Sequence, residues 1–303
     1  MTQRLMAIDT ATIYFRAFHG VPSSVTAPDG TVINAVRGTL DAVATLIEQF
    51  EPNQVVAAWD DAWRPAWRVA LVPEYKAHRV VAGTDSAEDV PEQLVPQIPL
   101  VREALSLLGI PVVGRQDQEA DDVLGALSRT WTGETRVVSG DRDLFQLVDD
   151  PANVSVIYTG AGMKKLQHVT DGWLAEKYGL GPGQYLDFAA LRGDTSDGLP
   201  GVAGIGDKTA AKLLTELGDL ESIVTAAAGE HGSLTPRIRA NLLASREYLD
   251  AVRQVIAVGR GLELDSVPTL AQPQWAAFDE FAALWGLGRP AARAKAAIES
   301  IRA

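Results

Sequence analysis

Acidic residues stand at the ends of apolar segments in the first half of the chain, and these are the side chains best suited to chemistry. Asp9 directly follows Leu5 to Ile8, and Asp60 directly follows Val55 to Trp59. If these segments are parallel strands, their carboxyl ends meet at one edge of a sheet, where ligands of such sheets bind. We therefore expect seven carboxylates to converge on one cleft: Asp9, Asp60, Glu119, Asp121, Asp122, Asp141 and Asp143. Asp194 and Asp197 can close that cleft from the second half.

Each of these acids also has a purely structural interpretation. An aspartate after a strand often caps the next helix, and Asp194 and Asp197 are typical turn residues. Capping and turn roles do not explain why so many carboxylates would gather in one cleft. Two carboxylates about 4 Å apart repel by about 4 kcal/mol at an effective dielectric constant of about 20. Cysteine is absent and the histidines show no zinc spacing, so the acids suit Mg²⁺ or Mn²⁺. Two such ions can activate a water against a phosphodiester, which is the chemistry that we expect.

A glycine-rich segment in the second half is suited to binding a phosphate backbone. Gly201, Gly204 and Gly206 come just before a helical pattern, and Lys208 adds positive charge there. Glycines let the backbone approach a phosphate closely, and a helix N-terminus presents N–H donors. The spacing does not match a Walker loop, and no Gly-x-Gly-x-x-Gly follows the first strand, so a nucleotide cofactor is disfavoured.

The segment from about Arg64 to Gln93 fits neither a strand nor a long helix. It contains Tyr75-Lys76-Ala77-His78-Arg79, whose Lys76 and Arg79 lie three residues apart and would share one face of a helix. We expect that face to hold a phosphate or a single strand. Arg64 and Arg68 are interpreted as solvated charges. The segment should bury no core of its own and should be poorly ordered without DNA.

The elements that must position these residues alternate along the first half. Apolar segments at Pro111 to Val113, Arg136 to Ser139 and Val154 to Tyr158 predict further strands. Helical spacing links Val36 with Phe50 and Leu94 with Leu108, and a helix is predicted over 122–131. This alternation predicts an α/β fold with a mainly parallel sheet flanked by helices. After about residue 170 only helices are predicted, at 173–178, 185–192, 208–217 and 236–258. We therefore expect a core at 1–170 and a helical lobe at 171–303.

Composition narrows the class of protein without deciding it. The 303 residues are 47% hydrophobic, with no apolar run of 18 residues and no signal-peptide pattern after the N-terminal Met. The absence of cysteine fits a reducing cytoplasm. The overall net charge of −12 argues against a nucleic acid partner. A sum of charges does not say where the charges lie, however, so a basic surface can still exist.

With these motifs in place, the chain resembles the bacterial 5′-nuclease family. That family includes the 5′–3′ exonuclease domain of DNA polymerase I, stand-alone flap endonucleases and phage relatives. The resemblance runs from Asp9 to about residue 290 and is carried by five motifs, in the family's order. They are Trp59-Asp60, Tyr75 to Arg79, Glu119-Ala-Asp-Asp122, Gly140-Asp-Arg-Asp-Leu-Phe-Gln-Leu147, and the segment 193–206.

The resemblance implies a PIN-like sheet domain, a helical arch at about 64–93 and a helix–three-turn–helix element that binds DNA. It implies that the acids above hold Mg²⁺ or Mn²⁺, and that Lys76 and Arg79 act on the scissile phosphate. The loop at Gly201 to Gly206 would grip duplex DNA and can hold K⁺, while Arg16 would lie near the substrate. A stand-alone enzyme is expected, removing 5′ flaps and RNA–DNA primers alongside a DNA polymerase and a ligase.

Other interpretations remain open at the level of sequence. A DNA-junction-binding protein of the same fold could lack catalysis, although bare like charges would not help a pure binder. A PIN-type ribonuclease is usually shorter and lacks the helical second half. Asp61 and Asp207 depart from the expected pattern by adding acids beside Asp60 and the glycine segment, which would weaken DNA affinity.

Overall fold

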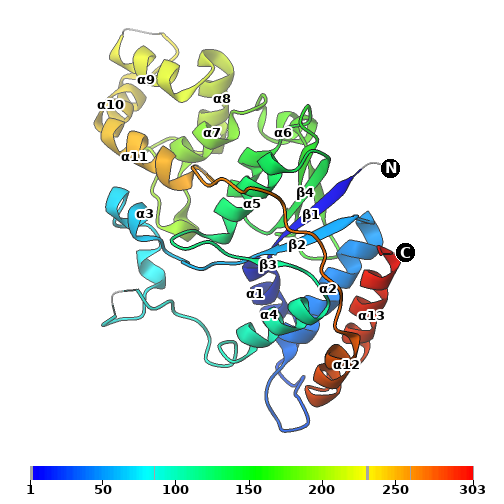
Figure 1. Ribbon diagram of the computed structural model, residues 1–303. Coiled ribbons are helices and arrows are strands. Elements are labelled where there is room, and N and C mark those ends of the chain that lie inside the picture. Colours follow the sequence, from blue (N-terminus) through cyan, green and yellow to red (C-terminus); the bar gives the residue numbers. More distant parts are fainter. Residues whose placement is uncertain (1–2, 85, 230–231, 260, 303) are drawn as a thin grey trace.

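A central sheet organises the computed structural model, which describes residues 3–84, 86–229, 232–259 and 261–302. Within these residues the sheet has six strands in the order β3-β2-β1-β4-β5-β6, all parallel except β6 (Figure 1). The strands are β1 (Arg4–Asp9), β2 (Gln54–Ala58), β3 (Val112–Val113), β4 (Glu134–Ser139), β5 (Val154–Tyr158) and β6 (Gln167–Val169). The parallel sheet predicted from the apolar segments is confirmed, and β6 is an antiparallel addition at its edge.

Alternate residues of β1 point to opposite faces of the sheet, as the period of a strand requires. Met6 and Ile8 pack into one core with five helices, whereas Leu5 and Ala7 belong to a second core on the other face with α5 (Ala120–Thr130). The five helices of the first face are α1 (Thr10–Gly20), α2 (Asn34–Phe50), α4 (Gln97–Leu107), α12 (Trp275–Leu284) and α13 (Gly288–Ser300). The sheet is therefore covered on both sides (Figure 1).

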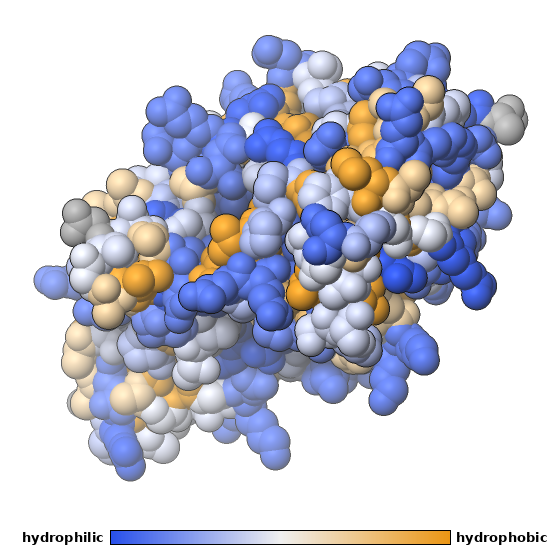
Figure 2. Space-filling model, turned by 90° about the horizontal axis from the view of Figure 1, so that it is seen from below, coloured by the Kyte–Doolittle hydropathy of each residue, from blue (hydrophilic) through white to orange (hydrophobic). Residues whose placement is uncertain are grey.

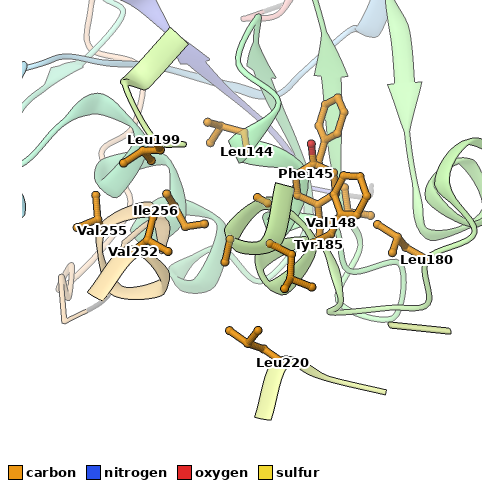
Figure 3. Packing of buried hydrophobic residues seen from close by; sticks show 14 of the residues in the cluster. Leu144, Phe145, Val148, Leu180, Tyr185, Leu199, Leu220, Val252, Val255 and Ile256 are labelled. Carbon is orange, nitrogen blue, oxygen red and sulfur yellow. The ribbon is translucent and has the colours of Figure 1, made fainter. Parts of the chain in front are cut away.

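The second core continues without a break into a helical lobe. The lobe consists of α6 (Asp171–Tyr178), α7 (Tyr185–Arg192), α8 (Asp207–Leu217), α9 (Leu220–Ala228), α10 (Pro236–Ala244) and α11 (Arg246–Ile256). Phe145, in the 3₁₀ helix η2 (Asp143–Leu147), is the aromatic centre of the joint. Its ring lies 5.1, 5.6 and 5.3 Å from the ring centroids of Tyr158, Trp173 and Tyr185. Figure 3 shows Phe145 and Tyr185 packed together, and Val252 and Val255 of α11 grouped with Ile256 at the left of the same view. The segment after Asp141 is thus fixed to the lobe.

The predicted helical lobe at 171–303 includes C-terminal residues that pack in the sheet domain. After α11 the chain returns to the sheet domain, where Phe278, Leu287 and Ile298 share the core that contains Met6. Backbone hydrogen bonds guide this return, from Ala271 N to Gly109 O at 2.8 Å and from Gln274 N to Leu107 O at 2.8 Å. Helices α12 and α13 therefore belong to the sheet domain, and α13 lies along α2 (Figure 1).

The helices predicted from apolar spacing also differ from the helices of the structure. The single helix predicted over 236–258 is two helices, because the chain turns at Ser245 between α10 and α11. No helix was predicted at α1, α9, α12 or α13. In both cases the direction of the chain is decided by packing between helices, which apolar spacing does not record.

The segment at 64–93 is anchored more firmly than the sequence predicts. It contains the short helices α3 (Ala66–Leu71) and η1 (Ala77–Arg79), and Val72 and Tyr75 are buried in the second core. The expectation that this segment buries no core is therefore wrong. From Val80 to Gln93 its described residues form no helix, and Asp85 lies outside the described residues. The segment for which a helical arch is expected, called the arch segment below, therefore has an anchored base with Lys76 and Arg79 and a second half in which the described residues form no helix.

The surface offers no membrane-spanning element among the described residues, since none of their helices is long and apolar enough to cross a bilayer. Figure 2 shows one face on which hydrophilic residues dominate the outline and hydrophobic residues appear in small, separate areas. Such scattered apolar residues are normal for a protein surface. Functional features must therefore be sought in the pockets.

Candidate active site

A pocket of about 770 Å³ lies at the carboxyl ends of β1, β2 and β4. Five of the expected acids line it: Asp9, Asp60, Glu119, Asp121 and Asp141. The order of the strands explains this meeting point. From β1 the chain continues into α1 on one face of the sheet, while from neighbouring β4 it continues into η2 on the other. A cleft opens where connections diverge in this way.

Hydrogen bonds from the backbone and from Ser139 hold the acids of this pocket in place. Asp9 caps α1 by accepting from Thr12 N at 3.1 Å, and its other oxygen accepts from Ser139 Oγ at 2.7 Å. The same Ser139 Oγ accepts from Asp141 N at 2.9 Å. Asp60 accepts from Ala120 N at 2.7 Å. The capping and the functional interpretations of Asp9 are therefore compatible, and Ser139 is a supporting residue that the sequence analysis missed.

Burial and like charge raise the pKa of several of these carboxyls. Burial, followed by the charge of Asp9, raises the pKa of Asp60 to about 7. Burial and Asp197 raise the pKa of Asp141 to about 6. The pKa of Asp121 is also raised well above its ordinary value, by burial and then by Asp9 and Asp141. The site therefore holds more negative charge than its surroundings neutralise, which is typical of functional carboxylates.

A buried arginine holds one side of the pocket. Arg68 is only 2% exposed, and its Nη1 donates to Glu119 Oε2 at 2.5 Å. The two guanidinium nitrogens also bind both oxygens of Asp122, at 2.7 and 2.9 Å. Nε donates to the carbonyl of Val255 at 2.8 Å, at the end of α11. The expectation that Arg68 is solvated is therefore wrong, because it neutralises two buried carboxylates.

Asp122 differs from the other expected ligands. Besides Arg68, its oxygens accept from Glu119 N at 3.1 Å and from Gly259 N at 2.9 Å. It does not line the pocket, and it is buried at the start of α5. Since both oxygens are committed to these partners, we leave Asp122 out of the set of metal ligands that we propose.

The basic residues of the arch base contact the acids directly. Lys76 Nζ forms an ion pair with Glu119, and its backbone amide donates to Asp197 O at 2.8 Å. The φ angle of Lys76 is +50°, a left-handed conformation that is uncommon for lysine and marks a constrained position. Arg79 Nη2 donates to Asp197 Oδ1 at 2.8 Å and to Ser196 O at 2.6 Å. Both Lys76 and Arg79 line the pocket, as does Arg16.

Three further acids, Asp143, Asp194 and Asp197, lie near Asp141 or near one another and do not line the pocket. Asp143 is buried, and its Oδ1 has no hydrogen-bond partner among the described residues. Burial, followed by Asp141, Asp197 and Asp194, raises its pKa. Asp194 caps the 3₁₀ helix η3 (Thr195–Asp197) by accepting from Ser196 N at 2.8 Å. The lobe therefore brings Asp194 and Asp197 towards the acids of the sheet domain.

Gln146 links this acidic group to the lobe, and the sequence analysis assigned it no role. Its Nε2 donates to the carbonyls of Asp143 and Ile256, both at 2.8 Å, and its Oε1 accepts from Val258 N at 3.1 Å. The residue stands in the motif at 140–147, so its place in the motif was the available signal. It connects η2 to the C-terminal end of α11.

The glycine-rich segment forms a tight turn before α8. Gly201 has a φ of +65°, and a Cβ there would lie 2.4 Å from the carbonyl carbon of Arg192, so the turn needs glycine. Gly204 also has a positive φ of +80°, and it is exposed together with Gly206 and Lys208. An added Cβ at Gly206 would meet no atom within 4 Å, which leaves open space at the start of α8. Phosphate can approach the backbone N–H groups at this N-terminus.

The residues present fit a hard cation by their chemistry. Carboxylate oxygens surround the pocket, an oxygen of Asp143 is buried without a partner among the described residues, and like charges raise the carboxyl pKa values. As they stand, no three His, Asp or Glu side chains of the described residues are grouped closely enough to hold one metal ion. Mg²⁺ retains several waters and needs few direct carboxylate ligands, so the wide spacing remains compatible with it.

Comparison with known proteins identifies the class to which this fold and pocket belong. Residues 4–179 match the "5′-3′ exonuclease, N-terminal resolvase-like domain", and residues 180–278 match the "5′-3′ exonuclease, C-terminal SAM fold". A 5′-3′ exonuclease of Streptomyces coelicolor is 49% identical over 291 residues, covering 93% of this chain and 96% of that protein. A 5′-3′ exonuclease of Mycobacterium tuberculosis is 44% identical, covering 90% of this chain and 88% of its own.

Solved structures agree on the fold. The T5 D15 protein, co-crystallised with metal ions, superposes with a TM-score of 0.65 at 20% identity over 99% of this chain and 100% of its own. The catalytic core of Rad2 in complex with DNA substrate gives 0.64 at 15% identity, over 99% of this chain and 92% of its own. The fold is PIN-like, and the protein is a nuclease. The chain belongs to the 5′-3′ exonuclease family.

The raised carboxyl pKa values predict how the stability of the metal-free protein depends on pH. Between about pH 4 and pH 7 the folded chain holds protons on Asp60 and Asp141 that the unfolded chain has released. Their contribution to the free energy of unfolding therefore falls as the pH rises through about 6 and 7. We expect urea unfolding in EDTA to show a steeper loss of stability from pH 5 to 8 in the wild type than in an Asp60→Asn, Asp141→Asn variant. Parallel pH profiles would contradict the assigned shifts.

Proposed function

We propose that this nuclease is structure-specific, cutting DNA near the junction between a duplex and a 5′ single strand, as a flap endonuclease and 5′–3′ exonuclease. The observation that carries the proposal is the pocket itself. Lys76 and Arg79 pair with the acids Glu119 and Asp197 there, and the lobe that carries Asp197 also presents the exposed glycine turn at 201–206. A junction contains a single strand and a duplex. The basic side chains suit the single strand, and the glycine turn suits the duplex. Removal of 5′ flaps and primers would follow.

We propose Mg²⁺ or Mn²⁺ as the cofactor. The set of ligands would be Asp9, Asp60, Glu119, Asp121, Asp141, Asp143, Asp194 and Asp197. Bound there, two divalent ions would supply an activated water and would neutralise the charge that develops on the phosphodiester. The protein's own part is to hold these acids together against their repulsion. Ser139 and the amide of Ala120 serve that purpose, because they donate to Asp9 and Asp60.

Lys76 and Arg79 would act on the scissile phosphate. In the structure each is paired with an acid of the site, Lys76 with Glu119 and Arg79 with Asp197. Burial alone would lower the pKa of Lys76, but Tyr75 and Glu119 outweigh burial and keep it well above its ordinary value, so the ammonium stays charged. Once released from Glu119, this ammonium can donate to a non-bridging phosphate oxygen, where its charge would favour the transition state.

The turn at Gly201, Gly204 and Gly206, with Lys208, would bind the backbone of the duplex without reading its sequence. Support comes from the exposed N-terminus of α8 and from the DNA bound to the similarly folded Rad2 core. Carbonyls of the same turn could hold K⁺, and Arg16 would contact DNA near the pocket. With DNA as substrate we propose a cytoplasmic enzyme that works with a DNA polymerase and a ligase, on RNA–DNA primers as well as flaps.

Neutralising acids of the pocket should slow cleavage strongly without unfolding the protein. In Asp121→Asn and Asp141→Asn we expect turnover of an end-labelled flap to fall by about 10²–10³-fold, the usual cost of removing a group that stabilises transition-state charge. The metal-free melting temperature should hold or rise, because a repelling charge is removed. Glu103→Gln, on the exposed side of α4, is the matched control and should retain activity. Near-wild-type cleavage by both pocket variants would remove the acids from the catalytic centre.

We expect Lys76 to contribute mainly to the rate of cleavage and Lys208 mainly to the binding of the duplex. Lys76→Ala should lower the single-turnover rate more than the affinity, since its charge acts mainly in the transition state. Lys208→Ala should lower duplex affinity and reduce the slope of log Kd against log salt by about one. Lys212, further along α8 and 66% exposed, supplies the control Lys212→Ala. The assignment fails if the Lys76 and Lys208 variants lose rate and affinity in the same proportion.

A further inference from the structure

The second half of the arch segment forms a short hairpin, residues 79–89, which lies between α3 and α4 (Figure 1). Val81 N donates to Ala87 O at 2.8 Å. Val80 and Glu88 form an antiparallel bridge beside this hydrogen bond. These backbone pairs fix the register of the hairpin, and the register decides which of its side chains face the acidic pocket.

Two contacts hold the hairpin against the sheet domain. Trp63 Nε1 donates to the carbonyl of Ser86 at 2.9 Å, and Trp63 itself lines the acidic pocket. Directly after the hairpin, Val90 packs against the core that contains Met6. The hairpin is therefore tied to the wall of the pocket through Ser86 and to the core at its end.

Glu88 is the acid that the hairpin places in the pocket. It lines the pocket and is half-buried, whereas Ala87 and Asp89 on either side do not line it and are exposed. This is the alternation that a strand requires, with neighbouring side chains on opposite faces. Glu88 forms no ion pair with any residue that the structure describes.

The carboxylate of Glu88 shares the pocket with Lys76 and Arg79, the two cations that we assign to the scissile phosphate. Burial raises the pKa of Glu88, and the charges of Lys76 and Arg79 act in the opposite direction, so both cations lie near enough to influence it. Each cation is already paired with another acid, Glu119 or Asp197. A phosphate that approaches these cations therefore also approaches the like charge of Glu88.

The glycine turn that we assign to the duplex lies outside this pocket. The structure describes every residue of the turn at 201–206, and none of them lines the pocket. A duplex held at the turn alone can therefore bind without bringing a phosphate up to Glu88. The two parts of a junction differ in this respect, since only the single strand has to enter the pocket.

We propose that Glu88 is a specificity-determining residue whose carboxylate opposes the entry of single-stranded phosphates into the pocket. The proposal rests on the proposed function and adds a reason for the choice of substrate. A strand without a duplex meets the repulsion of Glu88 with no other binding energy to offset it. A flap enters because the duplex bound at the lobe supplies that energy, so the enzyme favours junctions over free single strands.

Neutralisation of Glu88 tests the proposal on three ligands: a single-stranded oligonucleotide, a flap, and a closed duplex with a short loop at each end. With Ca²⁺ in place of Mg²⁺, we expect Glu88→Gln to lower the Kd of the oligonucleotide and of the flap several-fold, because a like charge is removed from the path of the phosphates. The Kd of the closed duplex should stay at the wild-type value. The Mg²⁺ concentration that gives half-maximal cleavage should also be unchanged.

Two matched variants separate the charge of Glu88 from its shape and from the overall charge of the hairpin. Glu88→Asp keeps the charge and should keep the wild-type Kd values. Asp89→Asn removes a negative charge from the exposed face of the same strand and should leave all three Kd values unchanged. The proposal is overturned by an unchanged or raised Kd of the oligonucleotide in Glu88→Gln, or by an equal effect of Asp89→Asn. A higher Mg²⁺ requirement in Glu88→Gln would also overturn it, because Glu88 would then be a metal ligand.

The two proposals fail separately. A wild-type protein that binds and cleaves the flap no better than the closed duplex refutes the proposed junction specificity. Tighter binding of the oligonucleotide by Glu88→Gln alone would still support the role of Glu88.

Discussion

The buried guanidinium of Arg68 is the interaction on which the rest of the site depends. It enters from α3 and binds two acids at the start of α5, the N-cap residue Glu119 and Asp122, together with the last turn of α11. Three parts of the fold that are distant in sequence meet at one side chain. An isolated buried charge would cost several kcal/mol, so each of these partners needs the others in place. The arch, the sheet domain and the lobe are thereby held in one arrangement.

This arrangement holds the carboxylates of the acidic pocket together although they repel one another. Arg68 and Lys76 neutralise Glu119, Arg79 neutralises Asp197, and the remaining acids raise one another's pKa values. Hydrogen bonds also connect the pocket to the end of α11 and the residues after it. The end of α11 accepts from Arg68 and Gln146, and Gly259 donates to Asp122. If the lobe moves when DNA binds, these hydrogen bonds would carry the movement to Asp143 and Glu119.

Much of the core could be predicted because local patterns determine it. Apolar segments ending in Asp9 and Asp60 predicted the parallel strands, and the fold then brought those carboxylates together at one edge. Arg68 could not be predicted, since an arginine between a tryptophan and a valine usually stays solvated and only tertiary contacts bury it. The return of α12 and α13 to the sheet domain was missed for the same reason. Their amphipathic spacing shows that a face is buried but not against which partner.

Unfolding of an Arg68→Met variant by urea, in EDTA, tests the central claim most directly. Methionine fills a similar volume but leaves Glu119 and Asp122 buried without their cation. The account predicts a loss of about 3–5 kcal/mol in the free energy of unfolding, the usual cost of breaking a buried ion pair on one side. Arg115→Met, at an exposed position, should stay within about 0.5 kcal/mol of the wild type. If Arg68→Met is equally neutral, the buried network does not hold the three parts together.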